Sequence, residues 1–230
     1  MKVLATKAPD KDAIAYATSL GFDLQGFNFI ASTAAAFDIT EVETSPYDSI
    51  AFTSANAVNY FFEKVSAATI KGKTVYAIQG KTSDALKQLG ISAKQTAENA
   101  GALSKKIIAT GKTKSLLHVC GNKVLDDLEE GVKAASIHYR KLVVYTTQLI
   151  PHEVKQDYDA LLFYSPSGVE SFLLKNKIPV DAVCCCIGVT TAMALTKNAE
   201  RASIITAKQP STQSMLDALG GYYKLQRKNE

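Results

Sequence analysis

Small hydroxyl, amide and glycine residues recur in this sequence directly after short apolar runs and before helical patterns. In the first half these turns contain Thr53, Ser54, Lys81, Thr82 and Asn122. In the second half they contain Ser165, Ser167, Gly168, Thr190, Thr191, Ser211 and Thr212. Backbone N–H groups at such turns, and the positive ends of the helices, point toward whatever lies at the carboxyl edge of the strands. We therefore interpret the turns as a rim that binds an anionic ligand.

The same residues have a simpler interpretation as helix N-caps. A Ser or Thr at the N-cap stabilises a helix by about 1 kcal/mol whether or not a ligand is present. The two roles are compatible, because a cap occupies one N–H group and leaves others for a ligand. Each turn taken alone favours capping, whereas their repetition favours a polyanionic ligand.

Tyr145 is the candidate for proton chemistry. It ends the apolar run 142–145, so its ring could be buried while its hydroxyl faces a cleft. A phenol can donate or relay a proton at pH 7 without being ionised. The alternative is an ordinary aromatic strand residue whose hydroxyl is exposed to solvent. Lys81 has a similar pair of interpretations, as a partner for a ligand carboxylate or as a solvated surface lysine.

Motifs for other chemistries are incomplete. Gly80-Lys81-Thr82 resembles the end of a phosphate-binding loop, but Val75 stands where that motif needs a glycine. Neither a GxGxxG nor a GxSxG motif is present. The three histidines lack metal-ligand spacing, so we interpret them as surface or capping residues. The four cysteines contain no CxxC pair, so we interpret them as packed in the protein interior. We therefore expect no metal and no cofactor.

Composition limits the class of protein. The 230 residues are 47% hydrophobic and 21% charged, with a net charge of +4, which fits a folded chain that binds an anionic small molecule rather than nucleic acid. The longest apolar run, 182–189, is too short to cross a membrane, and Lys7 and Asp10 interrupt any signal-peptide core. Buried, unpaired cysteines suit a reducing compartment. We expect a cytoplasmic protein, and a monomer because no apolar surface stripe or heptad is visible.

Apolar runs alternate with longer helical patterns along the chain. The expected strands cover residues 2–6, 48–53, 74–79, 115–119, 142–146, 160–164, 182–187 and 203–207. Nearly continuous apolar strands that alternate with helices predict an α/β fold of parallel sheets with helices on both faces.

An internal repeat organises these elements. Residues 47–54 match 158–165 at a separation of 158 − 47 = 111 residues, and 80–83 match 188–191 at 188 − 80 = 108. The repeat predicts two similar α/β domains. By itself it would divide the chain once, near residue 112.

Seven short blocks resemble, in order and spacing, the uroporphyrinogen-III synthase family. They are Phe52-Thr53-Ser54-x-Asn56-x-Val58, Gly80-Lys81-Thr82, Cys120-Gly121-Asn122, Val144-Tyr145-x-Thr147, Ser165-Pro166-Ser167-Gly168-Val169, Ile187-Gly188-x-Thr190-Thr191-Ala192 and Pro210-Ser211-Thr212. The resemblance runs from the first strand to about Leu219. It departs from the family at Thr6-Lys7-Ala8-Pro9 and at Asp126, where many members carry basic residues.

The resemblance implies two flavodoxin-like domains with a cleft between them. Residues 1–33 and 150–230 would form one domain and residues 42–141 the other, with 34–41 and 142–149 as crossing strands. It also implies a lyase of haem biosynthesis. Such an enzyme cyclises hydroxymethylbilane, with inversion of ring D and loss of water, to uroporphyrinogen III. The substrate would be handed over by hydroxymethylbilane synthase.

That chemistry agrees with the residues. A linear tetrapyrrole with eight carboxylates suits a rim of N–H groups and a mildly positive chain. Loss of hydroxide yields an electrophilic azafulvene without an enzyme nucleophile, and the hydroxyl of Tyr145 would help water to depart. The alternative function is a non-catalytic protein of two α/β domains that binds or senses an anionic metabolite.

Overall fold

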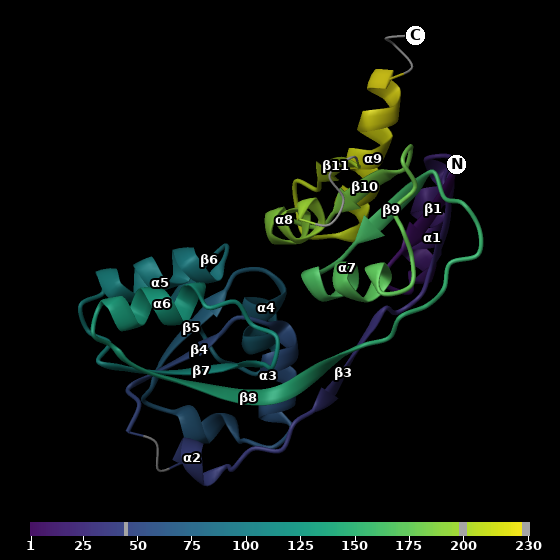
Figure 1. Cartoon of the computed structure of the whole chain (residues 1–230). Helices are drawn as coiled ribbons and strands as arrows, with labels where there is room; N and C mark the ends of the chain where they lie inside the picture. Colours follow the sequence, from purple (N-terminus) through teal and green to yellow (C-terminus); the bar gives the residue numbers. More distant parts are fainter. Residues whose placement is uncertain (44–45, 198–201, 227–230) are drawn as a thin grey trace. The chain divides into compact units, whose positions relative to one another are not determined.

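The structure is a computed structural model that describes residues 1–43, 46–197 and 202–226 (Figure 1). The chain divides into two compact units. The first unit comprises Met1–Ala31 and Gln148–Glu230, and the second unit comprises Ser32–Thr147. Residues 198–201 and 227–230 of the expected first domain lie outside the described residues.

The first unit is built on a parallel sheet with the strand order β11-β10-β9-β1-β2. Its strands are β1 (Lys2–Ala5), β2 (Asp23–Gly26), β9 (Ala160–Phe163), β10 (Val183–Cys186) and β11 (Ser203–Thr206). The central strands β9 and β10 are buried along their whole length, because helices cover both faces of the sheet. This burial explains why their sequences are continuous apolar runs rather than alternating ones.

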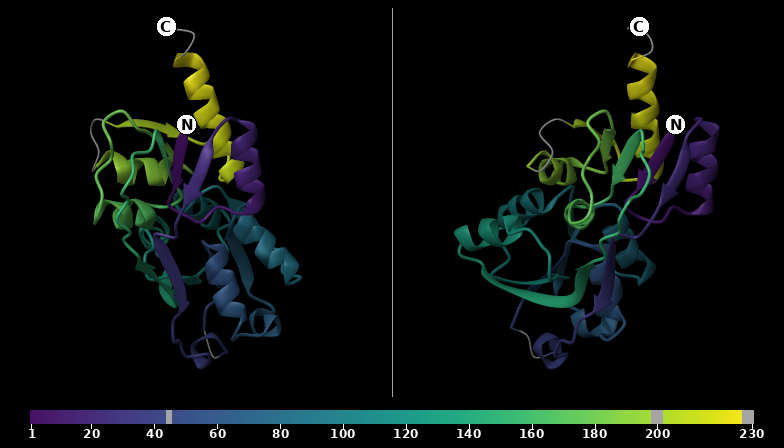
Figure 2. Two further views of the ribbon diagram at one scale, coloured as in Figure 1. Left: turned by 90° about the vertical axis from the view of Figure 1, so that its right-hand side faces the viewer. Right: turned by 45° about the vertical axis from the view of Figure 1, so that its right-hand side comes forward.

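Among the described residues, four helices cover this sheet. They are α1 (Lys11–Ser19), α7 (Pro166–Leu173), α8 (Val189–Thr196) and α9 (Thr212–Gln226). Alternate strand residues enter opposite cores: Val3 packs in the cluster that contains Met215 of α9, whereas Leu4 packs with Phe172 of α7. The helices α1 and α9, from opposite ends of the sequence, lie side by side (Figure 2).

The second unit contains a sheet with the strand order β3-β8-β7-β4-β5-β6. Its strands are β3 (Ile30–Ala34), β4 (Ser49–Phe52), β5 (Thr74–Ile78), β6 (Gln95–Ala97), β7 (Ser115–Gly121) and β8 (His138–Leu149). The pairs from β8 to β6 are parallel. β3 runs antiparallel to β8, since Thr33 bonds to Thr146 and the amide of Ala35 donates to Val144. A single division near residue 112 is therefore wrong, because β4 pairs with β7 across that point.

Helices also cover both faces of the second sheet. They are α3 (Ala55–Phe62), α4 (Lys81–Gln88), α5 (Ala100–Ala109) and α6 (Asp127–Ala134), with the short helix α2 (Thr40–Glu43) and the 3₁₀ helix η1 (Ala67–Ile70). Phe61 of α3 and Leu86 of α4 enter one core, and Leu103 of α5 and Val132 of α6 enter the other. The predicted α/β fold with parallel sheets and helices on both faces is confirmed.

All eight strands expected from the apolar runs are present, and the structure adds β2, β3 and β6. Of the crossing strand expected at 34–41, only Ala34 is in a strand, because β3 ends there and α2 begins at Thr40. All three additional strands are edge strands. An edge strand has a neighbour on one side only and needs fewer apolar residues. The apolar pattern in its sequence is therefore often weak, as in β6, where only Ala97 of Gln95–Ala97 is buried. In the described part of the chain, the helices are all too short or too polar to cross a membrane.

Candidate functional site

The carboxyl ends of β4 and β7 and the interior of β8 bring three of the predicted site residues together in the second unit. Ser54 is the N-cap of α3, and its Oγ accepts a hydrogen bond from the amide of Asn56 at 3.1 Å. The hydroxyl of Tyr145 donates to the same Oγ at 3.2 Å. Asn122 binds β8 beside them. Its backbone N–H donates to the carbonyl of Tyr145, and its side-chain Oδ1 accepts from the backbone N–H of Thr147. Two hydroxyls and an amide side chain therefore share one site.

An irregularity in the sheet positions the Tyr145 ring. The register between β7 and β8 shifts at Cys120 and Gly121, so that Gly121 pairs with Tyr145. A Cβ on Gly121 would lie only 2.5 Å from Cζ of Tyr145, so glycine is needed for the ring to lie across β7. The ring also stacks on Tyr60, with centroids 5.6 Å apart. The predicted buried ring is confirmed.

The environment of Tyr145 keeps the phenol protonated. Its ring is only 9% exposed, and burial raises the pKa of its hydroxyl above the usual 10, with a smaller opposing effect from Ser54. Near neutral pH the group is thus a hydrogen-bond donor and not a phenolate.

Thr53 is bonded to a histidine that the sequence analysis placed wrongly. Its Oγ1 lies 2.8 Å from Nε2 of His118, which is completely buried in β7 and not on the surface. Nδ1 of His118 lies 2.7 Å from the hydroxyl of Tyr139. The sequence does carry a signal, because His118 stands inside the apolar run of β7, where a polar side chain needs buried partners.

The turn after β5 presents a different arrangement. Gly80 is the N-cap of α4 with a positive φ of 79° and no side-chain cap. Lys81 is exposed, whereas the side chain of Thr82 is only 5% exposed. In this turn the lysine and the backbone N–H groups are therefore the accessible donors, and the Thr82 hydroxyl is not.

In the first unit, the turns after β1 and β9 lie in contact with each other. Ser165 is the N-cap of α7, and its Oγ accepts from the amide of Gly168 at 3.0 Å. The Oγ1 of Thr6 lies 3.2 Å from where a Cβ of Gly168 would be, so a side chain there would press on Thr6. Ser167, in the first turn of the same helix, is half-buried. The capping interpretation is thus confirmed for Ser165, as it is for Ser54.

The turns after β10 and β11 complete this edge of the first unit. Thr190 is exposed at the start of α8, whereas Thr191 is only 3% exposed. Ser211 accepts a hydrogen bond from the amide of Ser214 at 3.2 Å, and Thr212 accepts from the hydroxyl of Tyr164 at 3.0 Å. Ligand contacts of all these residues stay predictions.

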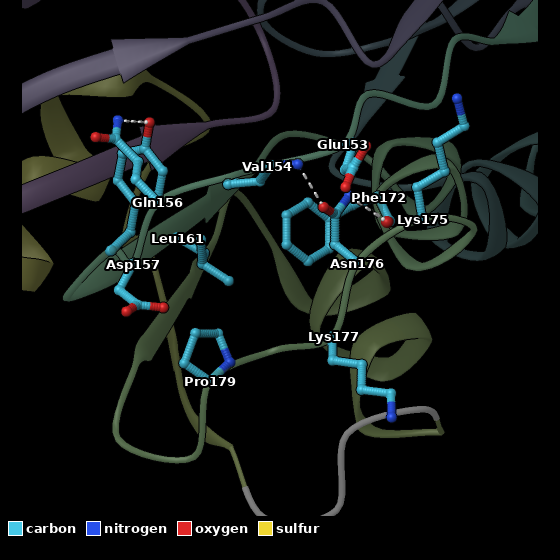
Figure 3. A pocket seen from close by; sticks show the side chains of 11 residues that line it. Glu153, Val154, Gln156, Asp157, Leu161, Phe172, Lys175, Asn176, Lys177 and Pro179 are labelled. Carbon is cyan, nitrogen blue, oxygen red and sulfur yellow. Dashed lines mark hydrogen bonds between the residues drawn. The ribbon is translucent and has the colours of Figure 1, made fainter.

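A separate hollow of about 210 Å³ lies at the amino end of β9, beside the end of α7 (Figure 3). Asn176 holds its wall: its Oδ1 accepts from the amide of Val154 at 2.7 Å, and its Nδ2 donates to the carbonyls of His152 and Phe172. None of the predicted site residues lines this hollow. Asn176 thus connects the segment 152–154 to the end of α7.

The thiols are poor candidates for chemistry. All four cysteines are buried, and burial raises the pKa of Cys120 to about 11 and that of Cys184, Cys185 and Cys186 to about 12. A thiol with such a pKa is not a nucleophile near neutral pH. Within the described ranges, no group of three or more His, Cys, Asp or Glu side chains could hold a metal ion.

Fold and site together define a class of two-unit α/β protein that carries neutral hydroxyls and helix N-termini at its strand ends. A family model described as uroporphyrinogen-III synthase HemD matches residues 17–217. The chain belongs to this family, whose members are cyclising lyases of tetrapyrrole biosynthesis.

Solved structures agree with the fold. The chain is similar to uroporphyrinogen-III synthetase from Helicobacter pylori, at 17% identity and a TM-score of 0.69, with 96% of this chain and 99% of that one covered. It is also similar to a mutant uroporphyrinogen III synthase from Thermus thermophilus, at 18% identity and a TM-score of 0.69, with 99% of both chains covered. The wild-type Thermus enzyme in another crystal form gives a TM-score of 0.54 at 18% identity, with 98% of this chain and 99% of that one covered. No curated protein sequence matches the chain.

Proposed function

We propose that this chain cyclises hydroxymethylbilane to uroporphyrinogen III, with inversion of ring D and loss of water. The observation that carries the proposal is the family match over residues 17–217. The hydroxyl and amide groups at the strand ends support it, because they suit a substrate with many carboxylates and a reaction that needs no nucleophile.

The reaction requires one assisted bond cleavage. The C–O bond of the hydroxymethyl group breaks, the oxygen leaves with the electron pair and takes up a proton, and the pyrrole nitrogen releases its proton as the azafulvene forms. The substituted carbon of ring D then attacks the azafulvene and forms a spiro intermediate. The bond from that carbon to the bridge toward ring C breaks, and the same bridge carbon bonds to the free α-carbon of ring D, which loses its proton as the pyrrole is restored. The protein contributes mainly by holding a flexible substrate in the folded conformation that this attack needs.

We assign Tyr145 as the residue that helps the hydroxyl group to leave. Its phenol is held beside Ser54 by the sheet irregularity and by Tyr60, and burial keeps it protonated. A protonated hydroxyl in this place can donate to the departing oxygen.

The carboxylates would be bound by the strand-end turns of both units. In the second unit the binding residues are Thr53, Ser54, Lys81, Thr82 and Asn122, and in the first unit they are Ser165, Ser167, Gly168, Thr190, Thr191, Ser211 and Thr212. Thr82 and Thr191 have buried side chains. Thr82 would act through its backbone N–H group, whereas the backbone N–H of Thr191 donates to the carbonyl of Gly188, so Thr191 would act by holding the turn in shape. We also propose that the two compact units correspond to the domains 1–33 with 150–230 and 42–141.

We further propose a cytoplasmic monomer that receives its substrate from hydroxymethylbilane synthase. The buried, unpaired cysteines support a reducing compartment. The substrate is consumed by spontaneous closure in water, which favours direct transfer from the enzyme that makes it.

An isomer assay tests the function. The protein is incubated with hydroxymethylbilane, the products are oxidised to porphyrins, and types I and III are separated by chromatography. Spontaneous closure yields type I, so a dominant type III product is expected from the active enzyme. Type I at the blank rate, from protein shown by circular dichroism to be folded, would refute the proposal and favour the binding or sensor function.

A further inference from the structure

A chain of three hydrogen-bonding side chains crosses the second sheet beneath the Thr53 turn. It consists of Thr53 after β4, His118 in β7 and Tyr139 in β8. The distances are 2.8 Å between Thr53 Oγ1 and His118 Nε2, and 2.7 Å between His118 Nδ1 and the Tyr139 hydroxyl. Thr53 is half-buried, whereas His118 is inaccessible to solvent. Thr53 therefore connects the edge of the sheet with groups inside it.

His118 is uncharged in the folded protein. Burial is the main cause that lowers its pKa to about 4, and Lys141 lowers it further, against a smaller opposing effect of Glu129. A neutral imidazole has one N–H donor and one acceptor nitrogen. The hydrogen bonds in the chain must therefore all run in one direction, either from Tyr139 toward Thr53 or from Thr53 toward Tyr139.

The phenol of Tyr139 can take either role in this chain, as donor to Nδ1 or as acceptor from it. Burial raises the pKa of Tyr139 above the ordinary value, so the group keeps its proton. If Tyr139 donates to Nδ1, the proton of His118 is on Nε2 and is donated to Oγ1 of Thr53. The hydroxyl hydrogen of Thr53 then points away from His118. In the reverse direction Thr53 would donate inward, and only its oxygen would be available to a ligand.

We propose that His118 is a positioning residue that, held by Tyr139 as the Nε2–H tautomer, directs the Thr53 hydroxyl to donate to a carboxylate of the substrate. The inference rests on the proposed function, because it assumes an anionic substrate at the Thr53 turn. Such a substrate favours this direction, since a carboxylate accepts hydrogen bonds and would be repelled by the lone pairs of an inward-donating hydroxyl.

Replacing Tyr139 tests the proposal without touching the ligand. Tyr139→Phe removes the donor to Nδ1, so the imidazole is no longer held in one tautomer and Thr53 can donate inward. We expect KM for hydroxymethylbilane to rise about threefold to tenfold with kcat within twofold, as for a weakened hydrogen bond to a charged group. Thr53→Val should raise KM at least as much, and the double variant should show little further rise.

The matched control is Tyr76→Phe. Tyr76 is buried in β5, belongs to the same core as Tyr139, and loses a comparable hydrogen bond, that of its hydroxyl to Thr113 at 2.8 Å. Its loss should lower stability without changing KM. Equal KM values in Tyr139→Phe and Tyr76→Phe would overturn the proposal.

Nuclear magnetic resonance provides a readout that needs no substrate. Long-range ¹⁵N–¹H spectra at pH 7 distinguish the two neutral tautomers, and variants of His138 and His152 leave the signals of His118 assignable. The Nε2–H tautomer in the wild type, with an added Nδ1–H fraction in Tyr139→Phe, is expected. An Nδ1–H tautomer in the wild type would overturn the inference. Failure of the proposed function is distinguished by the isomer assay, in which the wild-type protein would then form no type III product.

Discussion

Acidification should destabilise this protein through His118 in particular. The pKa of the side chain is about 4 in the folded state, against 6.5 for an ordinary histidine. Because the unfolded chain binds the proton more tightly, the stability is complete above pH 6.5 and is lost as the pH falls toward 4. The difference of 6.5 − 4 = 2.5 in pKa corresponds to about 3 kcal/mol in the limit, at about 1.4 kcal/mol for each pKa unit. Between pH 7.5 and pH 5 the expected loss is about 2 kcal/mol.

Urea unfolding at pH 7.5 and pH 5 measures this loss. The comparison is with His118→Gln, which cannot be protonated in this range and should lose about 2 kcal/mol less between the two pH values. Tyr76→Phe is the control, because it destabilises the same core without removing a titrating group. Glu129, whose bonds with Lys133 and Lys141 lower its pKa to about 2, titrates below pH 5 and so contributes little. Equal pH dependence in wild type and His118→Gln would refute the reasoning.

Three further predictions concern the predicted site. Tyr145→Phe should lower kcat about 100-fold, as for loss of a general acid, and activity within a few-fold of wild type would remove Tyr145 from that role. The double change of Thr190 and Thr191 to Val removes the exposed hydroxyl of Thr190, so it should raise KM if that hydroxyl binds a carboxylate, and an unchanged KM would leave both as structural residues. Gly121→Ala should lower both kcat and the melting temperature, since its Cβ would meet the ring of Tyr145 at 2.5 Å. Gly220→Ala in α9, where nothing lies within 4 Å, should leave kcat unchanged.

Local pattern was sufficient for much of the fold. The buried strands are continuous apolar runs, so their positions, their parallel arrangement and the burial of the cysteines could be predicted. Ser54 and Ser165 could likewise be predicted as N-caps, because capping depends on residues within one turn of the helix. The edge strands β2, β3 and β6 could not, since one such as β2 has a single buried residue, Leu24, whereas the edge strand β11 was predicted because it carries Ile204 and Ile205.

The candidate site depends on contacts that no local pattern contains. The sequence marked Tyr145 and Ser54 separately, but only the tertiary structure, through the register shift at Gly121, brings their hydroxyls together across 91 residues. His118 is similar: its neighbours in β7 predict a strand, whereas its partners Thr53 and Tyr139 come from two other segments. Which polar groups are buried together is decided by the pairing of distant strands, because a buried polar side chain is stable only beside a partner that the fold supplies.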